Sequence, residues 1–139
     1  MRAVEVVGEI REDAARELIA ETSHRDGRDW IQARDSAVLL LLYGCGLRIS
    51  EALGLQGRDH PLGDTLRITG KGNKTRIVPV LPAVHEACAR YVELCPFDLE
   101  PDAALFRGVR GGALGPRSVQ ALMSDLRARL GLAASATPH

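Results

Sequence analysis

The spacing of hydrophobic positions predicts a chain that is mostly helical. Across residues 11–22 apolar side chains recur at helical spacing, which is typical of an amphipathic helix. The polar stretch 23–29 has a glycine at its centre and predicts a loop. A second helix is expected over residues 36–43, with Asp35 as its N-terminal cap. Because that helix is apolar on all sides, it should lie at the centre of the fold.

Glycine and proline residues mark where the following helices begin and end. Gly44 and Gly46 should end the central helix, and a short helix with Ser50 near its start should follow. Pro82 suits the first turn of another helix, and Pro116 that of a last one, closed by Gly131. Their buried stripes are expected to be Val84, Cys88, Tyr91 and Cys95 in the first, and Val119, Leu122, Met123, Leu126 and Leu130 in the second.

Between these helices the hydrophobic period changes to strict alternation. Residues 66–69 and 75–78 alternate around the sequence GKGN, which predicts an antiparallel β-hairpin. Leu105 and Phe106 suggest a further short strand before a glycine-rich loop at 110–115. The expected fold is therefore α+β and mainly α, with a small antiparallel sheet.

Composition narrows the class of protein. Hydrophobic residues make up 45% and charged residues 26%, as in an ordinary folded soluble domain. The longest apolar run, residues 37–43, is far shorter than the roughly 20 residues that span a bilayer, and no export signal opens the chain. The three cysteines form no CxxC pair, and Cys88 and Cys95 are best explained as apolar fillers. The odd number of cysteines argues against a disulfide framework, so a reducing cytoplasm fits best. The four histidines share no metal-ligand spacing, so we expect no metal or cofactor.

The net charge of zero conceals an uneven distribution. Residues 36–80 carry a net charge of +3 and residues 103–139 a net charge of +4, and they alternate with acidic segments. If the basic segments meet on one face, a polyanion can bind there despite the neutral total. A surface of mixed, solvated charge explains the same numbers equally well.

Two segments contain candidate chemistry. In GCGLRISEALGL (44–55), Arg48 follows a glycine break among apolar residues, where a guanidinium needs an anionic or hydrogen-bonding partner. A structural ion pair with Glu51, three residues on, would satisfy it. The hairpin carries four cations that can follow a phosphate backbone: Arg67, Lys71, Lys74 and Arg76. Alternatively, the lysines only discourage pairing at the strand edges.

The order of three motifs adds a resemblance. GxGLRxSEALGL, then GKGNKTRIVPV, then TPH at the end of the chain resembles the catalytic domain of the tyrosine site-specific recombinases, or phage integrase family. The hairpin motif resembles most closely the Xer-type members (the XerC and XerD group), which resolve chromosome dimers in bacteria. The resemblance implies a linker or remnant at residues 1–10 and a partial catalytic domain at residues 11–139. It also implies action in DNA recombination, either dimer resolution or integration.

The same resemblance implies roles for individual residues. Arg48 corresponds to the first catalytic arginine, Glu51 to its acidic support, and Lys71 to the hairpin lysine that protonates the leaving oxygen. His139 corresponds to the histidine that opens the family's HxLR box. Double-stranded DNA is the expected partner, contacted by Arg67, Lys74, Arg76 and Arg117. Fixed cations of this kind stabilise the charge on a phosphoryl group in transfer, without metal or cofactor.

The resemblance is incomplete at its catalytic end. The second arginine and the nucleophilic tyrosine would follow His139, and the sequence ends there. Tyr43 and Tyr91 lie in apolar helical patterns and are expected to be core residues. We therefore expect the 139-residue chain to bind DNA weakly and not to cut it. Two alternatives remain: a non-catalytic DNA-binding or regulatory module, and a fragment that forms homodimers through exposed apolar surface. In the parent family a second recombinase subunit would be the protein partner.

Overall fold

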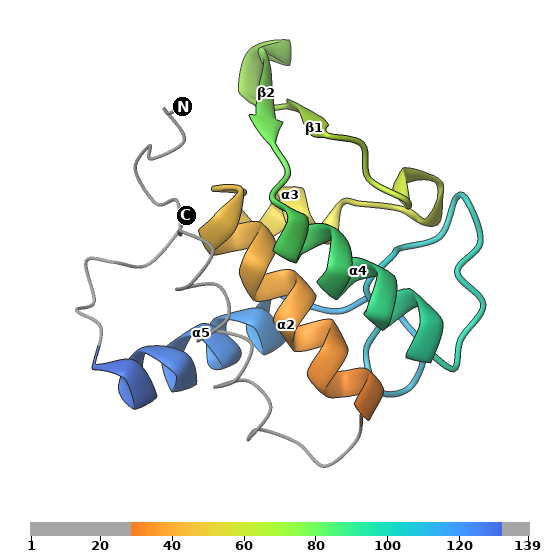
Figure 1. Cartoon of the computed structure of the whole chain (residues 1–139), viewed down its shortest axis with the longest axis vertical. Coiled ribbons are helices and arrows are strands. Elements are labelled where there is room, and N and C mark those ends of the chain that lie inside the picture. The colour runs from red at the N-terminus through yellow and green to blue at the C-terminus, as the bar shows by residue number, and fades with distance from the viewer. Residues whose placement is uncertain (1–28, 132–139) are drawn as a thin grey trace.

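Helix α2 (Asp29–Gly44) runs through the middle of the fold in a computed structural model that describes residues 29–131 (Figure 1). The side chains from Ala37 to Leu42 are at most 1% exposed. α2 packs mainly against α4, and also against α3 and α5. The remaining elements, in chain order, are α3 (Ile49–Leu53), η2 (Gly57–Asp59), β1 (Thr65–Thr69), η3 (Lys71–Asn73), β2 (Thr75–Pro79), α4 (Pro82–Leu94) and α5 (Pro116–Leu130). The predicted helix at 11–22, the linker at 1–10, most of the predicted loop at 23–29 and His139 lie outside the described residues.

The N-terminal boundary predicted for the central helix was wrong. α2 begins at Asp29, so Asp35 lies within the helix and is not its cap. Asp35 was expected to cap the helix from a polar position at its start, but Arg34, Asp35 and Ser36 are all buried. The two charges are paired locally, because Arg34 donates from Nε and Nη2 to Asp35 Oδ1 at 3.0 and 2.8 Å. Arg34 also makes a tertiary contact, because its Nη1 donates to the distant Arg107 carbonyl. The end of the helix at Gly44 was predicted correctly.

The predicted hairpin is confirmed and forms the two-stranded antiparallel sheet of the described residues. Its register pairs Leu66 with Val78 and Ile68 with Arg76. Leu66 and Ile68 are buried, and the residues that alternate with them are exposed, so one face of β1 lies against the body of the protein. At the tip, Gly72 and Asn73 adopt positive φ values of 71° and 60°. Figure 1 shows the hairpin projecting from one end of the helical body. The α+β, mainly α, prediction is therefore confirmed.

The two later helices also match their predicted stripes, except at their ends. Val84, Cys88 and Tyr91 of α4 are buried, as are the first four predicted residues of α5. Cys95 follows the end of α4 and is only partly buried, and Leu130 is 40% exposed. Cys95 is the C-cap of α4 and Leu130 is the last residue of α5. Burial raises the pKa of Cys88 to about 12, which agrees with its role as an apolar filler.

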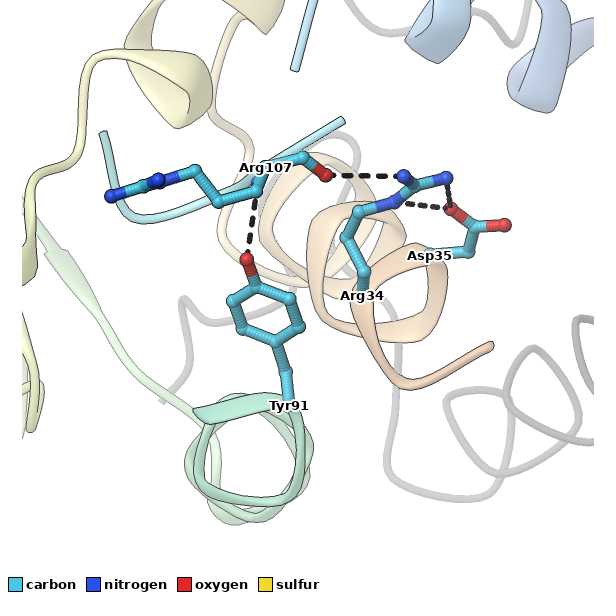
Figure 2. Close-up of polar contacts among 4 residues, drawn as sticks. All are labelled: Arg34, Asp35, Tyr91 and Arg107. Atoms are coloured by element: carbon cyan, nitrogen blue, oxygen red, sulfur yellow. Dashed lines mark hydrogen bonds and ion pairs between the residues drawn. The ribbon is translucent and has the colours of Figure 1, made fainter. Parts of the chain in front are cut away.

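A hydrogen-bonded network replaces the predicted strand at Leu105–Phe106. Isolated bridges stand on either side of this pair, and the loop is held by side chains. Tyr91 Oη donates to the Leu105 carbonyl at 2.7 Å and accepts the Arg107 N–H at 3.0 Å. Arg34 Nη1 donates to the Arg107 carbonyl at 3.1 Å. Figure 2 shows Tyr91 of α4 and Arg34 of α2 meeting at the backbone of Arg107. The network ties this loop to both helices.

Candidate functional site

The turn after α2 fixes the backbone of Arg48. The Leu41 carbonyl accepts the N–H groups of Cys45 and Leu47 at 3.3 and 3.2 Å, and Gly46 between them has a φ of 72°. Glycine suits this position because a side chain would be strained at positive φ. Arg48 follows as the N-cap of α3, with φ −78° and ψ 157°. The chain thus turns sharply and presents Arg48 at the start of a new helix.

The surroundings of Arg48 differ from those expected. Leu47 is fully buried, but Arg48 is exposed, and its side chain makes no hydrogen bond or ion pair within residues 29–131. The suggested ion pair between the Arg48 and Glu51 side chains is not formed. Instead, the Arg48 backbone N–H donates to Glu51 Oε1 at 2.8 Å, which satisfies one of the free donors at the helix start. The Arg48 guanidinium is therefore accessible to an external anion.

Glu51 is held by Arg76 of strand β2. Arg76 Nη1 donates to Glu51 Oε2 at 2.9 Å and Nη2 donates to Oε1 at 2.8 Å, so the pair is bidentate. The Glu51 side chain is only 9% exposed, against 41% for Arg76. The hydrogen bonds from Arg76 lower the pKa of Glu51 below its ordinary value, although burial opposes this. In return, Glu51 raises the pKa of Arg76. Both groups are therefore charged at neutral pH.

The same arginine joins the hairpin to the turn before α3. Arg76 Nη2 also donates to the Gly46 carbonyl at 3.3 Å. Near the hairpin tip, a Cβ added to Gly70 would lie 3.9 Å from Glu51 Oε2, which places the tip close to the carboxylate. Gly70 N donates to the Lys74 carbonyl at 2.7 Å and closes the loop that contains Lys71. The structure thus brings Arg48, Glu51 and Arg76 together beside the hairpin loop.

The other predicted site residues within the described part of the chain belong to the hairpin or to α5. Arg67 and Lys74 are exposed on the hairpin, and Arg117 is exposed in the first turn of α5. Lys71 begins η3 in the loop, and His139 lies outside the described residues. Among residues 29–131, no group of three or more His, Cys, Asp or Glu side chains could hold a metal ion.

Sequence reasoning missed the Glu51–Arg76 pair, although a signal was present. In the alternating pattern of β2, Arg76 and Val78 share the more buried face, while Thr75 and Ile77 are exposed. An arginine on the inner face of a strand requires an anionic partner. The sequence pattern does not show which carboxylate lies opposite this arginine once the hairpin packs on the body of the protein.

The chain matches the model of the phage integrase family over residues 9–139. It is 55% identical over 129 residues to a tyrosine recombinase XerC from Brucella suis, covering 91% of this chain and 41% of that protein. It is 58% identical over 116 residues to a tyrosine recombinase XerC from a Methylobacterium species, covering 82% of this chain and 36% of that protein. The chain therefore spans about two fifths of the length of these relatives.

Solved structures with the same fold include two recombinases. A crystal structure of XerA recombinase has a TM-score of 0.68 and 25% identity, covering 94% of this chain and 46% of that chain. A XerH site-specific recombinase bound to difH substrate in a pre-cleavage complex has a TM-score of 0.68 and 20% identity, covering 94% of this chain and 39% of that chain. No helix among residues 29–131 is long and apolar enough to cross a membrane. By its family match and its relatives, this chain belongs to the phage integrase family, with the Xer-type tyrosine recombinases.

Proposed function

We propose that the chain contributes the first part of a DNA-binding and phosphoryl-transfer site to a site-specific recombinase. The observation that carries this proposal is the exposed Arg48 guanidinium at the N-cap of α3, beside a hairpin held by Glu51 and Arg76. An arginine fixed at its backbone and accessible at its side chain suits a phosphate oxygen. Duplex DNA is the ligand, and the protein acts in the cytoplasm.

Within this site, the residues have separate tasks. Arg48 binds a non-bridging oxygen of the phosphate and stabilises the charge that develops there. Lys71, in the loop that Gly70 and Lys74 close, protonates the leaving oxygen, and His139 assists proton movement. Exposed Arg67, Lys74 and Arg117 contact phosphates along the duplex. The reaction proceeds by attack of a tyrosine on the phosphate, and a second recombinase subunit acts with this one on the DNA.

Neither tyrosine of the 139-residue chain can serve as that nucleophile. Tyr91 is fully buried, with its hydroxyl donating to Leu105, and Tyr43 is 9% exposed within α2. Burial raises the pKa of both hydroxyls, which further weakens them as nucleophiles. We expect no covalent complex when the purified chain is incubated with a nicked duplex and resolved on a denaturing gel. A covalent adduct that maps to either tyrosine would contradict the proposed assignment of both residues to the core.

DNA binding by the hairpin is tested through its salt dependence. Removing one cation that neutralises a phosphate should reduce the slope of log affinity against log salt by about 0.9, because one fewer counterion is released on binding. We expect Lys74→Gln and Arg67→Gln each to show this reduction in fluorescence anisotropy titrations with a labelled duplex at low salt.

Arg90 provides a matched control for the salt titrations. It is exposed in the second half of α4, which extends away from the hairpin in Figure 1. Arg90→Gln removes the same charge and should leave the slope unchanged. Equal slopes for the wild type and all three variants would rule out the hairpin as the DNA-contacting element. A wild-type chain that does not bind the duplex at low salt would rule out the proposed function itself.

A further inference from the structure

We propose that Arg76 is a positioning residue and not a DNA contact: with Glu51 it sets the orientation of the hairpin, and so of the Lys71–Asn73 loop, relative to Arg48. The part played by Arg48 and the loop in binding DNA rests on the proposed function. The positioning itself is a property of the fold and can be measured without DNA.

The geometry around one carboxylate oxygen is the first support. Glu51 Oε1 accepts the Arg48 backbone N–H and Arg76 Nη2, each at 2.8 Å. The same oxygen therefore fixes the N-cap of α3 and the strand β2. Any rotation of the hairpin that moves the Arg76 guanidinium must lengthen a bond to the group that also holds the Arg48 backbone.

The hairpin has few other directional contacts that could set its angle. Two-stranded hairpins are only marginally stable alone, so this one depends on its contact with the body. Leu66 and Ile68 supply apolar burial, which is not directional. A bidentate fork fixes both distance and angle, and Arg76 adds a third bond to the Gly46 carbonyl at 3.3 Å. Arg76 is directly opposite Ile68 in the register, so the fork acts on the buried side of the sheet.

The engagement of Arg76 argues against a role as a phosphate contact. Its Nη1 and Nη2 atoms make three hydrogen bonds to Glu51 and Gly46. Moving the guanidinium to a phosphate would leave the Glu51 carboxylate, only 9% exposed, without its cation. Leaving such a charge unpaired is strongly unfavourable. Arg67, by contrast, is exposed on the outer face of β1 and carries the same charge.

The double substitution Glu51→Gln, Arg76→Gln separates positioning from charge. It removes the ion pair without changing the net charge, and it leaves no buried charge unpaired. Residual dipolar couplings of the amides are measured for the hairpin and for α2, α4 and α5. In the wild type we expect both sets to fit one alignment tensor. In the double variant the couplings measured within the hairpin should still fit one alignment tensor, because the hairpin stays folded. That tensor should differ from the one that fits the couplings of the helices.

Arg67→Gln is the control for hairpin orientation. It removes a cation from the adjacent strand but leaves the bidentate Arg76–Glu51 pair intact, so the hairpin and the helices should still fit one alignment tensor. A double variant that also retains the common tensor would overturn the proposal. In DNA titrations, the double variant should bind more weakly than the wild type with an unchanged salt slope. A slope reduced by about 0.9 would instead identify Arg76 as a phosphate contact and overturn the proposal.

The pH dependence of one amide gives an independent readout. The Arg48 N–H donates to Glu51, so its chemical shift follows the ionisation of that carboxylate. Arg76 and, to a smaller extent, Arg48 hold the pKa of Glu51 below its ordinary value of 4.5. The Arg48 amide should therefore titrate below pH 4.5 in the wild type, and at higher pH in Arg76→Gln. An unchanged midpoint in Arg76→Gln would show that the pair does not control this carboxylate.

If the wild type fails to bind DNA while the couplings and the titration behave as expected, the proposed function fails and the positioning stands.

Discussion

Arg107→Ala is expected to destabilise the chain by about 3 kcal/mol, because it removes charge-assisted hydrogen bonds that are each worth roughly 1.5–3 kcal/mol and are not additive. The guanidinium donates to the carbonyls of Ala104 at 2.7 Å, Gly111 at 2.8 Å and Asp98 at 2.9 Å. These acceptors lie in the long connection between α4 and α5, which has no sheet of its own among the described residues to satisfy its backbone. The Arg107 side chain therefore supplies the hydrogen bonds that a neighbouring strand would otherwise give to these carbonyls.

Urea denaturation followed by circular dichroism measures this destabilisation, and Arg110→Ala is its matched control. Arg110 is exposed at the tip of the same turn, where Gly108 N donates to the Gly112 carbonyl at 2.7 Å. Its removal changes the net charge equally and should alter stability by less than about 0.5 kcal/mol. If both variants were destabilised equally, the effect would come from charge and not from the three carbonyls.

The elements that local pattern determines were predicted well. Alternation in Leu66–Thr69 and Thr75–Val78 located the hairpin, and Pro82 and Pro116 marked the first residues of α4 and α5. These signals are local because strand alternation and proline geometry depend on neighbouring residues. The strand predicted at Leu105–Phe106 failed for the opposite reason. Two buried residues do not reveal whether their backbone pairs with a strand or with side chains such as that of Tyr91.

The candidate site was only partly predictable, because its charges pair across distant segments. Glu51 and Arg76 are 25 residues apart, and their pairing depends on how the hairpin folds back on α3. Sequence spacing favoured Arg48 as the partner of Glu51, since three residues separate them on one helix. The extended backbone of Arg48 at the N-cap directs its N–H to the carboxylate instead. Arg34 shows the same limit, because its Nη1 donates to the carbonyl of Arg107, 73 residues away, and the sequence gives no sign of that contact.

Tyr91→Phe is expected to cost about 1–3 kcal/mol, although it removes only one oxygen atom. The hydroxyl donates to the Leu105 carbonyl at 2.7 Å and accepts the Arg107 N–H at 3.0 Å. Phenylalanine would leave the carbonyl of Leu105, a residue only 1% exposed, without this donor. The aromatic contact with Phe106, with ring centroids 5.2 Å apart, should be preserved. The change therefore isolates the hydroxyl from the packing of the ring.

Tyr43→Phe is the corresponding control at the other tyrosine. Tyr43 is 9% exposed, and its hydroxyl has no hydrogen-bond partner within residues 29–131, although the Arg127 guanidinium lies close enough to oppose the rise in its pKa that burial causes. Tyr43→Phe removes no hydrogen bond comparable to the two made by the Tyr91 hydroxyl, so it should destabilise the chain less than Tyr91→Phe does. Urea denaturation of the two variants compares the same chemical change in two environments. Equal destabilisation would show that the Leu105 and Arg107 bonds contribute nothing specific. Destabilisation confined to Tyr91→Phe would show that its hydroxyl holds the connection to the helices.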